Sequence, residues 1–299
     1  MNRRVGRLSA YRVSWHAEDM TPDLSRLIER LLPLAASFST GPAAIALAGA
    51  HAKGVADTQS DLDIYVFAEN WLDNERRRAL ALQVVPEAAG LRCWAALPAL
   101  AGTDFKVGAQ EVEMSMHALE PLRQTVARAL EGEVDRHYET WTPNGYYSDC
   151  ELADVANVVV LSDPAGLLAP LVEAVRAYPP KLKQRLIADG LRSAGFWIGN
   201  FHLETALSRA DGFYLQSMLQ QIVNDLVHAA FAINEVYFPG DKKMSRQLGK
   251  LKRLPEGFEA GLDAALLGRG DTSTAAWRER FAIVAHLTAG LRSLADSAG

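Results

Sequence analysis

Residues 45–67 read IALAGAHAKGVADTQSDLDIYVF, and this stretch decides how the N-terminal half of the chain is interpreted. Residues 45–48 form a short apolar run that ends at Gly49, and a polar loop rich in glycine, aspartate and serine follows. Those residue types are typical of turns. We therefore predict a strand, a turn and a loop, followed by a second strand over residues 61–67.

The second predicted strand carries two carboxylates on one face, because successive side chains of a strand point to opposite faces. Leu62, Ile64 and Val66 share the apolar face. Asp61 and Asp63 share the other face. Carboxylates that lie this close repel each other, so a purely structural role is unfavourable without a cation. A hard cation that prefers oxygen ligands, most often Mg²⁺, is the natural partner.

This combination resembles the signature of the nucleotidyltransferase superfamily with the polymerase-beta-like fold. That signature is an apolar strand, a Gly-Ser or Gly-Gly turn, a loop, and an acid-hydrophobic-acid triplet on the next strand. Its elements here are Gly49-Ala50, residues 52–54, Ser60 and Asp61-Leu62-Asp63. The spacing is similar to that of the minimal branch, which includes the aminoglycoside and lincosamide nucleotidyltransferases. The likeness covers the part of the chain before residue 118.

The resemblance implies a catalytic centre in which Asp61 and Asp63 bind Mg²⁺ together with a third carboxylate from a neighbouring strand. Glu113 is the first candidate for that third acid, because the residues on either side of it are apolar. Glu111 lies on the same strand face and is the rival candidate.

The resemblance also implies a nucleotide-binding turn and loop. Gly49 and Ala50 would contact phosphate through backbone N–H groups. Lys53 matches the basic position of the family's loop, and the hydroxyl of Ser60 would donate to a phosphate. Ala50 departs from the family, which usually has a serine there whose hydroxyl helps to hold a phosphate. Each residue also has a structural interpretation: a glycine that ends a strand, a solvated lysine, or a serine that caps a turn.

The expected fold class is α+β, with a polymerase-beta-like nucleotidyltransferase domain over residues 1–125 and a helical bundle domain over residues 126–299. In the first domain we also expect a helix over residues 70–85, with an exposed basic face at Arg76, Arg77 and Arg78, and a hairpin over residues 105–116. In the second, helical periodicity dominates. The helices expected there cover residues 151–161, 164–178, 181–209, 212–238 and further segments up to residue 298.

The helical half offers weaker candidates for acceptor recognition, a catalytic base or a triphosphate contact, each of which is better explained as a solvated or paired polar side chain. They are Asn200, His202, Glu204, Asn224, Asp225, His228, Lys181, Lys183, Arg185, Lys242 and Lys243.

Composition limits the class of protein. The chain has 299 residues, of which 49% are hydrophobic and 22% charged, and its net charge is −5. That charge argues against a broad nucleic-acid backbone binder, which usually carries a basic surface. Two cysteines suit neither a disulfide framework nor a Cys-rich zinc site. No apolar run reaches the length of a membrane span or signal segment. We expect a cytoplasmic protein that does not bind membranes, and the oligomeric state stays open.

The function expected from the resemblance is Mg²⁺-dependent transfer of a nucleoside monophosphate, AMP from ATP being the first expectation, to a hydroxyl of a small-molecule acceptor such as an aminoglycoside. Pyrophosphate would be released. Two alternatives remain: an enzyme that transfers AMP to a protein, and a nucleotide-binding regulatory module that has lost catalysis.

Overall fold

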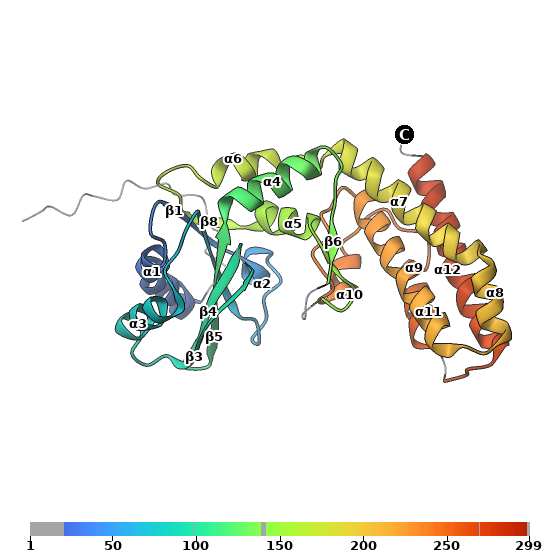
Figure 1. Cartoon of the computed structure of the whole chain (residues 1–299), viewed down its shortest axis with the longest axis horizontal. Coiled ribbons are helices and arrows are strands. Elements are labelled where there is room, and N and C mark those ends of the chain that lie inside the picture. The colour runs from blue at the N-terminus through green and yellow to red at the C-terminus, as the bar shows by residue number, and fades with distance from the viewer. Residues whose placement is uncertain (1–20, 98, 139–141, 269, 298–299) are drawn as a thin grey trace, which may run out of the picture. The chain divides into compact units, whose positions relative to one another are not determined.

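The structure is a computed structural model that describes residues 21–97, 99–138, 142–268 and 270–297. It divides into two compact units whose elements are labelled in Figure 1. The first contains the described residues up to 124 together with residues 154–176, and the second contains residues 125–153 and the described residues from 177 onward. A mixed sheet with helices forms the first unit and helices dominate the second, so the predicted α+β class is confirmed.

The first unit is built on a six-stranded sheet with the order β3-β4-β5-β2-β1-β8. Strands β2 and β5 pair in parallel, and all other neighbours in this sheet pair antiparallel. The strands are β1 (Ala43–Leu47), β2 (Leu62–Ala68), β3 (Ala89–Leu97), β4 (Leu100–Val107), β5 (Gln110–Ala118) and β8 (Val159–Ser162). The two strands predicted around the acidic pair and the predicted hairpin, formed by β4 and β5, are therefore confirmed.

Helices α1 (Pro22–Ser37) and α3 (Asn74–Val84) belong to the same unit, as do the short helices α2 (Gly49–Ala52) and α6 (Ala169–Ala174). Helix α1 begins at Thr21, whose hydroxyl accepts a hydrogen bond from the N–H of Leu24, and proline follows at its first position, where proline is favoured. Its apolar residues join a core with the buried face of β2, where Leu62 and Ile64 are fully buried.

Arg77 does not belong to an exposed basic face. Arg76 and Arg78 are exposed as predicted, but Arg77 is only 1% exposed. Its guanidinium donates to the carbonyls of Leu72 (3.1 Å), Gly102 (2.7 Å) and Trp94 (3.1 Å). The prediction was wrong for this residue because backbone acceptors from β3 and β4, distant in sequence, satisfy its donors. Arg77 thereby ties α3 to the sheet.

The segment after α5 (Asp149–Asn157) also differs from the prediction. A helix was expected over residues 151–161, but the chain becomes extended at Val159 and forms β8, which pairs antiparallel with β1. The backbone of an apolar β1 gains hydrogen-bond partners in this way, which explains why a Val-Val-Leu run becomes a strand. Residues 154–176 therefore belong to the first unit, whereas the sequence interpretation places them in the helical half.

The helical unit is centred on α9 (Gly212–Ile233), of which thirteen residues are buried. The expected helix over residues 181–209 is interrupted at Asn200, whose side chain caps the second of two shorter helices by accepting from the N–H of His202. Helices α4 and α5 each cross the division between the units. The remaining helices among the described residues are α4 (Leu119–Leu130), α7 (Pro180–Gly199), α8 (Phe201–Ser208), α10 (Met244–Leu248), α11 (Phe258–Leu267) and α12 (Thr274–Asp296). None of the helices in the described ranges is long and apolar enough to cross a membrane.

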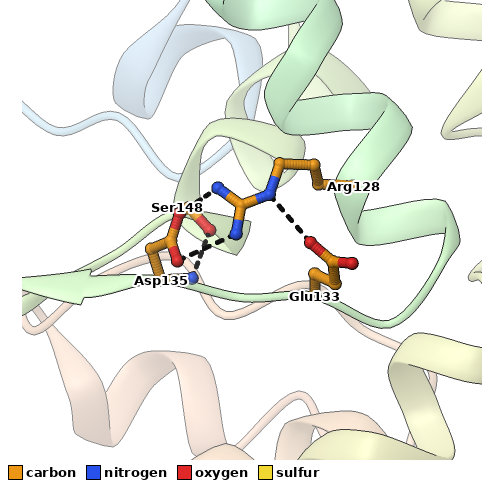
Figure 2. Close-up of polar contacts among 4 residues, drawn as sticks. All are labelled: Arg128, Glu133, Asp135 and Ser148. Atoms are coloured by element: carbon orange, nitrogen blue, oxygen red, sulfur yellow. Dashed lines mark hydrogen bonds and ion pairs between the residues drawn. The ribbon is translucent and has the colours of Figure 1, made fainter.

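A small hairpin, β6 (Arg136–His137) and β7 (Tyr146–Tyr147), lies in the helical unit. Figure 2 shows the polar contacts that hold it. Arg128 donates to Glu133 and to Asp135, and the N–H of Asp135 donates to the hydroxyl of Ser148 at 3.0 Å. Exposed ion pairs contribute little to stability, and the Asp135–Ser148 bond is the contact that joins the chain just before β6 to the chain just after β7.

The buried position of Arg77 leads to a prediction about stability. Arg77→Met should lower the free energy of unfolding by at least about 3 kcal/mol, because the carbonyls of Leu72, Gly102 and Trp94 lose a buried donor. Arg76→Met, which removes an exposed arginine from the same turn of α3, should change it little. Urea unfolding of both variants measures the difference, and equal losses would show that the Arg77 contacts do not hold the helix to the sheet.

Candidate acidic site on the sheet

The parallel pairing of β2 and β5 brings two of the predicted acids together. In the strand register Asp63 lies opposite Glu113, between the buried pairs Leu62–Val112 and Ile64–Met114. Because side chains alternate, both carboxylates project from the face opposite the core, on strands whose backbones lie about 4.8 Å apart. Asp61 precedes β2 directly. The three acids chosen from the sequence thus occupy one region of the sheet.

The structure also distinguishes Glu113 from its rival. Glu111 forms an ion pair with Lys106, its cross-strand neighbour in the β4–β5 hairpin. Glu113 is exposed and is the residue paired with Asp63. The geometry therefore favours Glu113 as the acid that shares a site with Asp63.

Two acids near the site were not identified from the sequence. Asp104 on β4 pairs with Glu113 on the side away from β2, which extends the acidic row to a third strand. Asp154 on α5 lies close enough to raise the pKa of Asp63. Asp104 could have been found from the alternation of side chains along β4, which puts it on the same face as Glu113. No local sequence pattern indicates Asp154, because it lies near Asp63 only when the chain returns to the sheet after the β6–β7 hairpin.

Asp63 is the electrostatic centre of this group. Burial raises the pKa of its carboxyl to about 7, and the negative charges of Glu113, Asp61 and Asp154 add to the effect. The positive charge of Lys53 acts in the opposite direction. The site therefore holds more negative charge than its own lysine compensates, which is the environment that attracts a cation.

The glycine turn touches the acidic group. Gly49 begins the one-turn helix α2 with a φ of +60°, a backbone conformation that L side chains rarely adopt. A Cβ placed on Gly49 would lie 1.7 Å from Oδ2 of Asp63, so only glycine allows the carboxylate its present position. The N–H of Ala48 also donates to the carbonyl of Asp63 at 2.9 Å. The turn is thus a support for Asp63.

The loop residues assigned to nucleotide binding make contacts within the chain itself. The ammonium of Lys53 lies 3.1 Å from a carboxylate oxygen of Asp154. The hydroxyl of Ser60 accepts from the N–H of Asp57 (2.9 Å) and donates to its carboxylate (3.1 Å). Ala50 is half-buried. The structure therefore places these residues next to the acids but engages the two polar ones in local contacts.

Four of the weaker candidates in the helical half form ion pairs with other side chains. Lys181 pairs with Glu131 and Lys183 with Glu235. Arg185 pairs with Asp189, and Glu204 pairs with Arg278. These four side chains are therefore paired polar groups, which is the structural alternative given in the sequence analysis. Asn224 and His228 form no such ion pair and line a cavity in the helical unit.

A metal ion would meet oxygen donors at the acidic site. Within the described residues no group of three or more His, Cys, Asp or Glu side chains is already arranged to hold an ion. Mg²⁺ is usually held by one or two carboxylates together with waters and substrate phosphates, rather than by an all-protein cage. Asp61, Asp63 and Glu113 therefore fit Mg²⁺ in donor chemistry, with ligands left for a nucleotide to supply.

Comparison with known proteins gives a family match over part of the chain and a distant structural likeness. Residues 147–244 match the family described as "Domain of unknown function (DUF4037)", a range that covers less than half of the chain and lies outside the acidic strands. None of the curated proteins compared with the chain matches it. One similar solved structure is a nucleotidyltransferase-like protein from Exiguobacterium sibiricum 255-15, at 10% identity and a TM-score of 0.43. That match covers 89% of this chain and 74% of the other.

The contact between Gly49 and Asp63 can be tested with two alanine substitutions. Gly54→Ala should cost about 1 kcal/mol, because Gly54 has a φ of +62° and open space around it. Gly49→Ala should cost about 2 kcal/mol more, since it adds a collision with Asp63 to the same backbone strain. Denaturant unfolding of both variants measures the difference. Similar losses would mean that the Asp63 carboxylate does not lie against the turn.

Proposed function

We propose that the protein is an Mg²⁺-dependent nucleotidyltransferase, which moves a nucleoside monophosphate from an NTP, in the first instance AMP from ATP, to a hydroxyl of a small-molecule acceptor. The observation that carries the proposal is the register of β2 and β5, which sets Asp63 opposite Glu113 on the outer face of the sheet with Asp61 beside them. The motif in residues 45–67 supports it, because its residues resemble those of the nucleotidyltransferase superfamily.

In this proposal the carboxylates of Asp61, Asp63 and Glu113 hold the ion. Bound Mg²⁺ would neutralise charge on the phosphates and lower the barrier to transfer. The chain's own contribution is positional, because the paired strands fix two carboxylates side by side and Gly49 leaves room for one of them. Well-fixed groups contribute to catalysis because their geometry requires no reorganisation during the reaction.

The proposed transfer is a single displacement at phosphorus. The acceptor hydroxyl oxygen forms a bond to the α-phosphorus, and the bond from that phosphorus to the α–β bridging oxygen breaks. The electron pair of the broken bond leaves with pyrophosphate, and the hydroxyl proton passes to solvent. A net charge of −5 suits a cationic acceptor such as an aminoglycoside.

A second candidate is a nucleotide-binding regulatory module without catalysis. The observation that favours it is the engagement of Lys53 by Asp154 and of Ser60 by Asp57, together with the absence of a hydroxyl at Ala50. A loop whose donors are already used offers less to a phosphate.

A labelling experiment tests the proposal. The full chain is incubated with Mg²⁺, each α-labelled NTP and a panel of acceptors that includes aminoglycosides and lincosamides. Label on a small molecule with release of pyrophosphate is the expected result. Label on a protein would instead identify a protein-modifying enzyme, nucleotide binding without turnover would favour the regulatory module, and no binding of any NTP would overturn all three functions.

Removing either aspartate should abolish transfer. Asp61→Asn and Asp63→Asn should each reduce the transfer rate roughly a hundredfold or more, since each removes an anionic oxygen ligand. Asp23→Asn on the exposed surface of α1 serves as the control. Without metal, Asp63→Asn should also raise the melting temperature, because like-charge repulsion with its neighbours is lost. Wild-type turnover by either site variant would exclude the proposed metal ligands.

The two glutamates of β5 should differ in their effect. Glu113→Gln should reduce transfer far more than Glu111→Gln, because Glu113 is paired with Asp63 while Glu111 is held by Lys106. Initial rates at saturating Mg²⁺ and NTP provide the comparison. A greater loss for Glu111→Gln would assign the third acid to that residue instead.

A further inference from the structure

The helical unit contains a cavity system that the proposed transfer chemistry does not use. One cavity of about 390 Å³ lies between the β6–β7 hairpin and α9. A second, of about 160 Å³, shares the lining residues Asn144, Gln220 and Asn224 with the first. Cavities of several hundred Å³ with a few convergent polar groups are typical of small-molecule sites.

His228 lines the second cavity and is the feature that points to a ligand. Its ring is only 5% exposed and is enclosed by Tyr147 and Phe238, with ring centroids at 3.9 and 3.8 Å. Neither ring nitrogen has a hydrogen-bond partner in the described chain. Burial, with a smaller effect of Arg136, lowers the pKa of this histidine to about 3, so the ring is neutral near pH 7. A neutral imidazole offers one donor and one acceptor.

The side chains that both cavities share are uncharged and offer both donors and acceptors. The amide of Gln220 donates to the amide oxygen of Asn224 at 3.0 Å, which leaves each side chain with further hydrogen-bonding capacity. A hydroxyl group can donate and accept at once, so it can satisfy an amide or a neutral imidazole from either side. Hydroxylated ligands therefore match this lining better than ligands that only accept or only donate.

Arg136 provides the planar cationic part of the first cavity. Its guanidinium lies 5.0 Å from the ring centroid of Tyr147 and donates to Gln221 at 2.9 Å, while its buried Nε has no partner in the described chain. Gly145 allows this position, because a Cβ there would lie 2.6 Å from Nε. Figure 2 shows that Arg128 holds Glu133 and Asp135 before the hairpin that carries Arg136, while the N–H of Asp135 bonds Ser148 after it.

The charges that line the two cavities balance. Arg136 is the charged residue of the first cavity and Asp241 that of the second, within the described lining. The combined lining therefore has no net charge that would compensate the burial of a strongly charged ligand of either sign. Aromatic rings from Tyr138 and Tyr147 supply apolar faces, which suit the C–H faces of a saturated ring.

We propose that this cavity system binds an uncharged, polyhydroxylated ring compound, a monosaccharide or a cyclitol, with His228, Gln220 and Asn224 as its main hydrogen-bonding contacts. The proposal concerns the helical unit alone and does not rest on the nucleotidyltransferase function proposed above.

Calorimetric titration of the full chain tests the proposal. The probes are glucose, galactose, mannose and myo-inositol, with glucosamine, glucuronate and inorganic phosphate as charged comparisons. At least one uncharged probe should bind with a Kd of about 1 mM or tighter, and more tightly than any charged probe. No binding of the uncharged probes up to about 10 mM, or tighter binding of a charged one, would overturn the proposal.

Three variants localise the binding. His228→Phe should weaken it roughly tenfold or more, because the ring nitrogens are lost while an aromatic ring remains. Asn224→Leu, on the partly exposed wall of the cavity, should also weaken binding roughly tenfold or more. It is the deciding variant if His228→Phe fails to fold. His286→Phe replaces an exposed histidine of α12 and should leave binding unchanged. Unchanged affinity in a folded Asn224→Leu variant would place the ligand elsewhere and reject the assignment.

Discussion

The parallel pairing of β2 with β5 is the constraint on which the candidate site depends. Two residues fifty positions apart in the sequence, Asp63 and Glu113, become direct neighbours only in this register. The register is fixed by apolar alternation, since Leu62, Ile64, Val112 and Met114 are all buried on the opposite face. A slip by one residue would turn the carboxylates into the core, so the packing that stabilises the sheet also specifies the site.

The acidic face is organised against local stability. Burial and neighbouring carboxylates disfavour the charge on Asp63, and the turn beside it requires glycine at position 49. The unfavourable free energy of this face is offset by the packing of the core on the opposite face of the sheet and by the hydrogen bonds of the buried Arg77. Local conflicts of this kind are expected at functional sites, where the requirements of chemistry compete with those of folding.

Local patterns were sufficient for part of this structure. Alternation in residues 61–67 identified β2 and its acidic face, and the β4–β5 hairpin followed from its glycine turn. Long-range effects escaped the sequence interpretation. The burial of Arg77 depends on carbonyls of β3 and β4, and the strand β8 forms because β1 needs a partner. Asp154 approaches the acids for the same reason, and the pairing of Ser60 with Asp57 was visible only as a general turn preference. The cavity at His228 likewise requires the hairpin and α9 to come together, which no local pattern records.

The route of the chain through β8 has a consequence for biosynthesis. The apolar strand β1 is made early, yet the partner that covers its free edge is encoded more than a hundred residues later. Until β8 leaves the ribosome, β1 is an uncovered edge strand, the kind of surface that pairs with other chains. A fragment that ends near residue 125 would keep this edge permanently. The N-terminal unit is therefore completed only after all of residues 125–153, which belong to the helical unit, have been synthesised.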